Sequence, residues 1–467
     1  MNISLLKQGD KEKIMKLTEE AIEKTGFIIE NEELRTILSK NGAVIDEISG
    51  KTTIPGDVLR EYLSLVPSSY TIRGLDNEER KIGGGEQYLS AIVTDPWIID
   101  YQSRKVRRPG LDDVLRNTIL SQKNPKVASI GRMDFPVTEY ADAHSSNRAL
   151  ELHLLNHTKH YNVYTACMED LWMWMDIGQI MLQGKKLKGS GLMSVAVAVV
   201  SPFILPDFNC RALMVAAEKD LTVIPTICPM AGTTSPYSLD GTLLQGNIEN
   251  IFLAAITQMV NPGNPFLYAF GPSISDMRTG HDMYYTVEKV LWKIAATELA
   301  KAYDMPCSAE CGGTLGAGYD MQSGAESMLF MLTAQNPGAD ILAGVGSCYN
   351  ANGLSSEMIV MQSEWFEMAS YLSKGIDTGN MDKSLISIIE QGPGGNFLMD
   401  DTTIENLRSS EFYSPRNLDM SGGYREAPSM LQNAHERVIE LTRNYESPVP
   451  ESIQEDIRRF FKKIYDT

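Results

Sequence analysis

Basic residues are scarce in this sequence. Its 467 residues include 42 Lys and Arg against 60 Asp and Glu, which gives a formal net charge of −18 at pH 7. A surface this acidic repels phosphate backbones, so we expect no nucleic-acid partner. The densest basic run, residues 104–108, is too short to form a binding stripe and is typical of a solvated turn.

Long apolar runs are missing as well. The most apolar segment, residues 191–206, is interrupted by serines and prolines and falls short of the ~18 continuous apolar residues that a membrane span needs. The first residues include Lys and Asp where a signal peptide would have its apolar region. The six cysteines lie mostly within apolar segments, as reduced thiols do. We therefore expect a cytoplasmic protein without membrane contact.

Standard catalytic motifs are absent too. The sequence has no P-loop, no HExxH and no GxSxG, and its glycine-rich segment 312–318 lacks the spacing of a dinucleotide-binding loop. Two interpretations of that segment stay open. It is either a flexible loop or a backbone that a ligand approaches closely because no side chain intervenes.

What the sequence does contain is a regular alternation of short apolar segments with longer amphipathic ones, from about residue 127 to 374. This pattern indicates parallel strands joined by helical crossovers. Its span of about 250 residues is that of a (β/α)8 TIM barrel. A doubly wound sheet is the alternative, because periodicity does not detect closure. We predict strands at 127–130, 161–166, 192–200, 221–227, 265–270, 306–309 and 340–345, and helices at 140–155, 169–182, 208–219, 239–260, 287–303 and 322–335.

The predicted strands number seven, and the eighth is either 91–99 or a weak strand after Asp382. We divide the chain into an N-terminal extension with helices and a β-hairpin (1–110), the barrel (111–400) and a C-terminal helical segment (401–467). The extension is predicted to have helices at 11–24, 32–40 and 56–65 and strands at 70–73 and 88–93. The C-terminal segment is predicted to end in a pair of charged helices within 429–465.

In a barrel, the loops that follow the strands meet at one mouth, so their residues are the functional candidates. These loops are rich in aromatic and acidic residues and poor in Lys and His, which favours a cationic ligand over a phosphate. The candidates are Asp134, Phe203, Tyr237, Phe270, Asp276, Arg278, His281, Glu310, Tyr349, Asn350 and Asn352.

Two sets of residues have metal-ligand spacing. His153, His157 and His160 share one helix face, but they lie at its end, remote from the mouth, so a structural interpretation is favoured. A zinc thiolate site of Cys307, Cys311 and Cys348 can be drawn, although buried free thiols are commoner. We predict no resident metal.

Several motifs together resemble one family. They are Gly83-Gly84-Gly85 with Arg107-Arg108-Pro109, Gly232-Thr233-Thr234-Ser235-Pro236, Asn261-Pro262-Gly263, Asp276 with Thr279-Gly280, Gly312-Gly313-Thr314, and the segment from Asp320 to Glu326. Their order and spread over residues 10 to 460 resemble the trimethylamine methyltransferase (MttB) superfamily. The resemblance implies a barrel that passes a methyl group from a methylated amine to the cobalt of a separate corrinoid protein.

The resemblance also narrows the substrate. Founding members use pyrrolysine for trimethylamine, whereas residues 314–322 here are all standard amino acids. The chain is thus similar to the relatives that demethylate quaternary amines such as glycine betaine, proline betaine, carnitine or γ-butyrobetaine. Cob(I)alamin on the partner corrinoid protein is then the methyl acceptor, and no cofactor is bound tightly.

Physical chemistry fits this choice, because a quaternary ammonium loses its methyl group as a neutral tertiary amine and needs no acid assistance. The site must hold the ammonium, orient one methyl group and exclude water. We predict an aromatic cage of Phe203, Tyr237, Phe270 and Tyr349. We assign Asp134, Asp276 and Glu310 as carboxylates opposing the cation, and Arg278, His281, Tyr349, Asn350 and Asn352 as donors to a substrate carboxylate.

Two other functions remain open. One is a non-catalytic or sensory protein that binds the amine, and the other is a zinc-dependent methyltransferase that acts on a thiol or alcohol through the three cysteines. We also expect a homo-oligomer.

Overall fold

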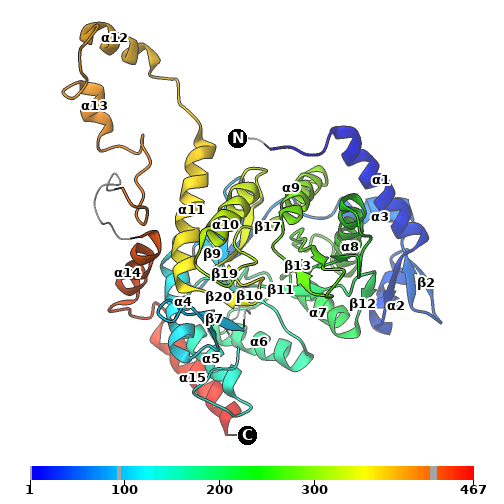
Figure 1. The fold of residues 1–467 in the computed structure, drawn as a ribbon. Coiled ribbons are helices and arrows are strands. Elements are labelled where there is room, and N and C mark those ends of the chain that lie inside the picture. Colours follow the sequence, from blue (N-terminus) through cyan, green and yellow to red (C-terminus); the bar gives the residue numbers. More distant parts are fainter. Residues whose placement is uncertain (1–2, 92–95, 132, 134, 421–428, 467) are drawn as a thin grey trace.

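The protein is built around one parallel β-sheet (Figure 1). The computed structural model describes residues 3–91, 96–131, 133, 135–420 and 429–466. Seven parallel strands form the central sheet, in the spatial order β13-β11-β10-β9-β6-β18-β17. They are β6 (Tyr88–Ala91), β9 (Val127–Gly131), β10 (His160–Val163), β11 (Met193–Ala198), β13 (Thr222–Thr226), β17 (Ser308–Glu310) and β18 (Ile341–Val345). The prediction of parallel strands with helical crossovers is confirmed.

The strand left open by the sequence is β6, which lies between β18 and β9. Neither stated alternative is correct. Of the range 91–99, β7 (Trp97–Ile99) pairs instead with β8 (Val106–Arg107) and β20 (Gly353–Leu354) in a separate small sheet. The residues after Asp382 belong to helix α12 (Met381–Gln391). One sheet strand thus comes from the segment expected to form the N-terminal extension.

The segment 265–270 connects to both edges of the sheet. Phe266 is bridged in parallel to Val223 of β13, and Tyr268 to Cys307, next to β17. Four backbone hydrogen bonds of 2.8 to 3.1 Å support these bridges. The two edge strands of the curled sheet are therefore hydrogen-bonded to one and the same segment.

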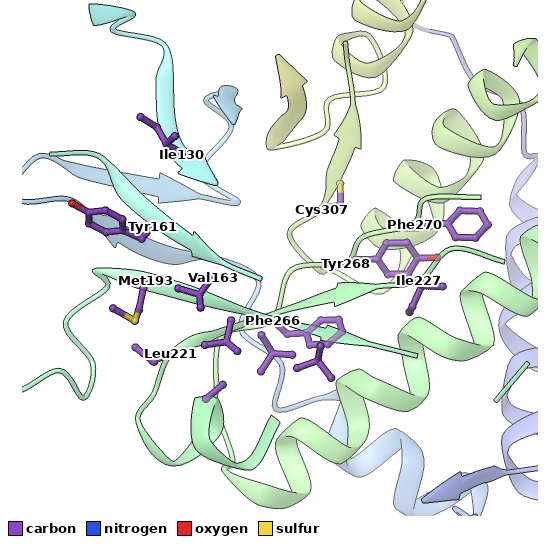
Figure 2. Close-up of a cluster of buried hydrophobic side chains, with 14 of the residues drawn as sticks. Ile130, Tyr161, Val163, Met193, Leu221, Ile227, Phe266, Tyr268, Phe270 and Cys307 are labelled. Carbon is purple, nitrogen blue, oxygen red and sulfur yellow. The ribbon is translucent and has the colours of Figure 1, made fainter. Parts of the chain in front are cut away.

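A helix follows nearly every strand and packs on the outer face of the sheet. The helices are α4 (Leu111–Lys123), α5 (Ser145–Leu154), α6 (Met168–Met181), α7 (Asp207–Glu218), α8 (Leu239–Val260), α9 (Val287–Ala302), α10 (Met321–Gln335) and α11 (Ser356–Lys374). Side chains alternate along the strands. In β10, Tyr161 and Val163 join the apolar layer, whereas Asn162 faces the small polar interior of the sheet. Figure 2 shows part of this layer, from Ile130 and Tyr161 to Tyr268 and Phe270.

The N-terminal residues form a cover on this framework. Helices α1 (Gln8–Lys24), α2 (Glu32–Lys40) and α3 (Gly56–Leu63) pack against α8. Strands β1 (Phe27–Ile29), β2 (Val44–Asp46) and β3 (Lys51–Thr53) make a sheet with β12 (Ile204–Leu205), which follows β11. Strands β4 (Tyr70–Arg73) and β5 (Glu79–Ile82) form an antiparallel pair. The predicted helices and the first strand of the extension are confirmed.

Short strands extend the loops at the carboxyl ends of the sheet. Strands β14 (Met230–Ala231), β15 (Ser273–Ser275) and β16 (Asp282–Met283) form one small sheet, and β19 (Ser347–Cys348) joins β20, β7 and β8 in another. These strands place the loops after β13, the 265–270 segment and β18 around the same end of the molecule.

The C-terminal part consists of helices outside the sheet. Beyond α12 and α13 (Asp401–Asn406), helix α14 (Met430–Thr442) packs on α11 and α4, and α15 (Glu451–Tyr465) packs on α5 and α6. The predicted pair of terminal helices is confirmed. Within the described residues, none of the helices combines the length and the apolar character needed to cross a lipid bilayer.

Candidate functional site

A cavity of about 290 Å³ opens at the carboxyl ends of the strands. Its wall is formed by the ends of β13, β17 and β18, the residues after β10 and the 265–270 segment, and the loop between β16 and α9. This is the position that the sequence predicted for the functional residues. Its size is at the lower end of the range for pockets that hold small molecules.

Glu310 is the carboxylate of this cavity. It is the last residue of β17, and alternation turns its side chain inward together with Ser308. Lys293 of α9 forms an ion pair with it, and Nζ of Lys289, one helical turn earlier, lies 3.4 Å from its Oε1. The hydroxyl of Tyr284 donates a hydrogen bond of 2.5 Å to the same oxygen. We call these four residues the Glu310 cluster.

The charges of the cluster are strongly coupled. Burial alone would raise the pKa of Glu310, but the ammonium groups of Lys289 and Lys293 lower it to about 2. Burial lowers the pKa of Lys289 to about 7, against the opposing attraction of Glu310. Burial and the neighbouring carboxylate raise the pKa of Tyr284 well above its usual value. At neutral pH Glu310 is therefore ionised, Tyr284 is a hydrogen-bond donor, and Lys289 loses its proton far more readily than an exposed lysine does.

Lys293 lines the cavity, and both lysines reach Glu310 because they are four residues apart on α9 and so share its inner face. Their side chains are almost fully buried, and Lys293 also donates to the backbone carbonyl of Phe270. Nζ of Lys289 lies 2.8 Å from the ring centroid of Tyr284. Gly271 leaves room for this packing, since a Cβ there would come within 2.8 Å of the Tyr284 hydroxyl and 3.3 Å of Glu310 Oε1.

Asn350 fixes the position of Tyr284. Its Oδ1 accepts from the backbone N–H of Tyr284 at 2.7 Å, and its Nδ2 donates to the carbonyl of Asp282 at 2.7 Å. Asn352 in turn donates to the carbonyl of Asn350 at 2.9 Å. These two predicted donors are thus engaged in joining loops, and Tyr349, half-exposed beside them, has a left-handed backbone with φ of 51°.

The glycine-rich segment turns out to be closely approached, but by a side chain of the protein. Gly313 has a φ of 124°, and a Cβ there would overlap the ring of Tyr285. Tyr285 lines the cavity, and its hydroxyl donates to Ser347 Oγ at 3.1 Å. The missing side chain at this glycine therefore makes room for an aromatic wall of the cavity.

Two of the predicted cage residues have rings that pack elsewhere, although Phe270 also belongs to the cavity wall. The ring of Phe270 packs on α8, where a Cβ on Gly246 would overlap it, and its backbone carbonyl contacts Lys293. Figure 2 shows the ring beside Tyr268 and Ile227 in the buried layer. Phe203 has a φ of 62° and packs on Phe27, with ring centroids 5.1 Å apart.

The remaining predicted residues lie on the surrounding loops. Asp276 accepts from the backbone N–H of Arg278 at 2.9 Å and from Thr279 Oγ1 at 2.8 Å, in the turn between β15 and β16. These bonds, the Arg278 N–H first, lower its pKa. Arg278, His281 and Tyr237 are exposed and do not line the cavity. Asp134 is outside the described residues.

The cysteines and histidines with metal-ligand spacing occupy buried structural positions. Cys307 and Cys311 belong to the apolar layer, and burial raises the pKa of both thiols. Burial also lowers the pKa of His153 to about 3 and of His160 to about 4. In the described part of the chain, no three His, Cys, Asp or Glu side chains are grouped as metal ligands would be.

The cavity residues that sequence reasoning missed include Lys293, Tyr164, Cys228, Tyr284 and Tyr285. The predicted candidates on the loop after 265–270 end at His281, whereas Tyr284 and Tyr285 return to the cavity only after the β15–β16 hairpin. A signal for the lysines was available. Lys289 and Lys293 stand four apart on a helix whose buried positions are otherwise largely apolar, and a lysine pair at such positions needs a buried acid.

Comparison with known proteins identifies the class of this molecule. The family model described as trimethylamine methyltransferase (MTTB) matches residues 1–466. The chain belongs to this family and is a methyltransferase, as its motifs implied.

Two relatives indicate the range of the family. The glycine betaine methyltransferase of Desulfitobacterium hafniense (strain Y51) is 26% identical over 453 residues, which cover 95% of this chain and 93% of the relative. The trimethylamine methyltransferase MttB of Methanosarcina thermophila is 24% identical over 458 residues, covering 94% and 93%.

Solved structures support the fold. The monomethylamine methyltransferase MtmB of Methanosarcina barkeri superposes with a TM-score of 0.50 at 11% identity, covering 97% of this chain and 92% of that one. A hydroxylamine complex of MtmB gives a TM-score of 0.51, also at 11% identity, with coverage of 98% and 92%. The likeness extends over nearly the whole of both chains.

Proposed function

We propose that this methyltransferase demethylates a betaine-type quaternary amine and passes the methyl group to the Co(I) corrinoid of a separate protein. The family membership supports methyl transfer, and the match to a glycine betaine methyltransferase supports the amine class. The observation that carries the choice of a zwitterion is the Glu310 cluster.

The cluster carries both signs of charge. Lys293 and Glu310 neutralise each other, and Lys289 adds up to one further positive charge. A purely cationic amine would find its only acidic partner in the described cavity wall already paired with lysine. A zwitterion can direct its carboxylate to the Lys293 ammonium, in a charge-assisted hydrogen bond, and its ammonium to the remaining wall.

The remaining wall offers aromatic faces for that ammonium. Tyr164, Tyr284 and Tyr285 line the cavity, and each ring is worth roughly 0.5 to 2 kcal/mol to a cation, depending on desolvation. We assign to these three tyrosines the cation-binding role that was predicted for Phe203, Tyr237, Phe270 and Tyr349. Of the predicted carboxylates, Glu310 keeps a place beside the substrate.

The reaction requires the cavity residues only to bind and orient the substrate. The C–N bond breaks with its electron pair remaining on nitrogen, and the methyl group goes to the reduced cobalt, which supplies the nucleophile. The leaving amine is neutral, so Glu310, Lys293 and the tyrosines need only hold the substrate, turn one methyl group toward the opening and exclude water.

The methyl acceptor fits outside the cavity better than within it. A volume of about 290 Å³ suits a small amine, but it is too small to hold a corrin macrocycle in addition to the amine. The loops and helix ends that follow the strands carry exposed apolar side chains, among them Tyr237, Met277 and Met321. Such side chains are typical of a surface that another protein covers, and we assign it to the corrinoid protein.

We also infer that the sheet closes into a (β/α)8 barrel, with the 265–270 segment as its remaining member. Support comes from the hydrogen bonds of this segment to both edge strands. The small polar cavity below the Glu310 cluster is consistent with closure, because its lining includes residues from this segment and from all seven strands. An enclosed wall of this kind excludes water from the substrate.

The test is a substrate panel with reduced cobalamin. Glycine betaine, proline betaine, carnitine, γ-butyrobetaine and trimethylamine are each incubated with the protein, and the loss of Co(I) absorbance is followed. We expect at least one betaine to methylate cobalamin faster than trimethylamine does. Calorimetric binding of a betaine without any methyl transfer would instead identify a binding or sensory protein. Activity only on thiols or alcohols, together with stoichiometric zinc, would identify the third alternative.

A further inference from the structure

Residues 375–410 form an arm that leaves the body of the protein. Within it, helices α12 and α13 have no buried residue, and Figure 1 shows both projecting past the end of α11. The chain comes back to the body at a defined place, because hydrogen bonds hold the residues that follow the arm. The hydroxyl of Tyr371 donates to the carbonyl of Glu411 at 2.7 Å, and Glu364 accepts from the backbone N–H groups of Arg416 and Asn417 at 2.7 and 2.9 Å.

Apolar side chains are concentrated on this arm. Of the 31 large apolar side chains that are exposed in the described part of the chain, 11 belong to these 36 residues. They are Ile376, Met381, Leu385, Ile386, Ile388, Ile389, Phe397, Leu398, Met399, Ile404 and Leu407, with exposed fractions from 44% to 90%. A monomer rarely exposes so many large apolar side chains on one short segment.

In helix α12 the exposed apolar side chains lie on one face. Successive residues of a helix advance by about 100°, which brings the five apolar side chains of α12 into about half of its circumference. Lys383, Ser384, Ser387 and Glu390 occupy the other half, and Asp382 is the one charged residue within the apolar half. An isolated helix of 11 residues is not stable in water, so α12 needs a surface that buries this face.

The net charge of the arm limits which kinds of partner can cover its apolar side chains. It contains six Asp and Glu against one Lys and one Arg, and this acidic excess disfavours nucleic acids and anionic lipid. Its 36 residues are comparable to the 20 to 30 that each side contributes to a stable protein interface. The charge and the size of the arm both favour a protein as the partner.

The position of the arm separates it from the cavity. Helix α11 begins next to β20, on the cavity side, and its 19 residues carry the chain about 28 Å toward the opposite end of the sheet before the arm starts. A corrinoid protein that docks at the cavity must also come and go, and transient interfaces are less apolar than permanent ones. A second copy of the chain is present at the same concentration from synthesis onward, and a twofold axis makes one patch complementary to itself.

We propose that the arm joins two copies of this chain, each arm burying its apolar face against the other copy. The inference is independent of the substrate. Its test is the sedimentation of the full-length protein over a range of micromolar concentrations. We expect a dimer, or a larger assembly with an even number of copies.

The decisive variant is Leu385→Lys with Ile389→Lys, which charges the apolar face of α12. We expect the dissociation constant to rise by at least about a hundredfold, because both side chains lie at the centre of the face. Glu390→Lys is the matched control, since it introduces the same side chain on the polar face, and it should leave the assembly intact. Replacement of residues 376–409 by a short Gly-Ser linker should give a folded monomer, because the arm contributes no buried residue to the body.

Three results would overturn the proposal. One is a wild-type protein that sediments as a monomer throughout. Another is an assembly that persists both in the double lysine variant and after removal of the arm. The third is a monomer that gains mass only when the corrinoid protein is added and loses that gain in the double lysine variant, which would assign the arm to that partner.

Discussion

The hydroxyl of Tyr284 donates a hydrogen bond to Oε1 of Glu310 across 2.5 Å. The two residues come from different parts of the chain, one following the β15–β16 hairpin and the other ending β17. Because the pKa of Tyr284 is raised and that of Glu310 is lowered to about 2, the donor and the acceptor keep these parts throughout the neutral range. The bond holds the carboxylate of the cavity in one orientation.

The first prediction concerns a substitution that removes this hydrogen bond alone. Tyr284→Phe keeps the ring next to Lys289 but loses the hydroxyl. A hydrogen bond to a charged group contributes about 1.5 to 3 kcal/mol, so we expect kcat/KM for a betaine to fall by about tenfold or more. The measurement is the initial rate of cobalamin methylation. Tyr303→Phe, at the end of α9 and away from the cavity, is the control and should leave this rate unchanged. Equal losses of kcat/KM in the two variants would contradict a specific role of the Tyr284 hydroxyl.

The second prediction concerns the substrate carboxylate. Lys293→Met removes the ammonium that we assign to it, so KM for glycine betaine should rise by about tenfold or more. Choline, which has the same ammonium without a carboxylate, should be affected less. Lys301→Met tests for a general effect of removing a lysine from α9, because Lys301 lies further along the helix and contacts the carbonyl of Pro337. If KM rises equally for both amines, Lys293 does not bind a carboxylate.

The third prediction is a pH dependence. The pKa of Lys289 is lowered to about 7, so below pH 7 the Glu310 cluster carries a net positive charge and above pH 7 it approaches neutrality. KM for a betaine should therefore rise as the pH increases through 7, whereas KM for choline should fall. Lys289→Met should flatten both profiles. A betaine profile that has the same slope in Lys289→Met would remove this lysine as the cause.

The fourth prediction concerns the thiol in the cavity wall. Cys228 lines the cavity and is accessible from its opening, and the surrounding protein, which removes bulk water from around the thiolate, raises its pKa to about 11. Its alkylation by iodoacetamide should be slow at neutral pH, should accelerate toward pH 10, and should be slowed by bound betaine. Peptide mass spectrometry measures the modified fraction. Labelling at Cys228 that betaine does not slow would place the substrate elsewhere.

The elements of this fold were predictable where sequence pattern and burial agree. Helix α8 spans the predicted range because its ends are marked, with Ser238 accepting from Gly241 N–H at the start and Asn261 closing the last turn. The strands were found because segments buried on both sides have continuous apolar runs. Strand β6 was predicted as a strand over 88–93 but was assigned to the N-terminal hairpin, because it lies before residue 127, where the regular alternation begins.

The site was predictable only in part, because strand position does not determine where a side chain ends up after a turn. Glu310 is in the cavity because it lies on a strand, where alternation fixes its direction. Phe203 follows a strand by several residues, and its left-handed backbone turns it toward Phe27. Asn350 was expected to bind substrate, whereas it binds backbone groups of the neighbouring loop. Pairings of this kind depend on loop geometry, which periodicity does not contain.

The last prediction tests how the helices support the cavity. The ring of Phe270 lies directly on Gly246 of α8, and the carbonyl of the same residue contacts Lys293. Gly246→Ala should push the ring outward, with an overpacking cost of about 1 to 3 kcal/mol, and should also disturb Lys293. Gly324→Ala is the matched control, because this helical glycine of α10 has open space at the Cβ position, so the substitution should stabilise the protein by about 0.5 to 1 kcal/mol. Thermal melting and KM for betaine are measured for both variants. We expect a lower Tm with a higher KM in the first and neither in the second, and a Gly246→Ala protein with wild-type values would show that the cavity does not depend on this contact.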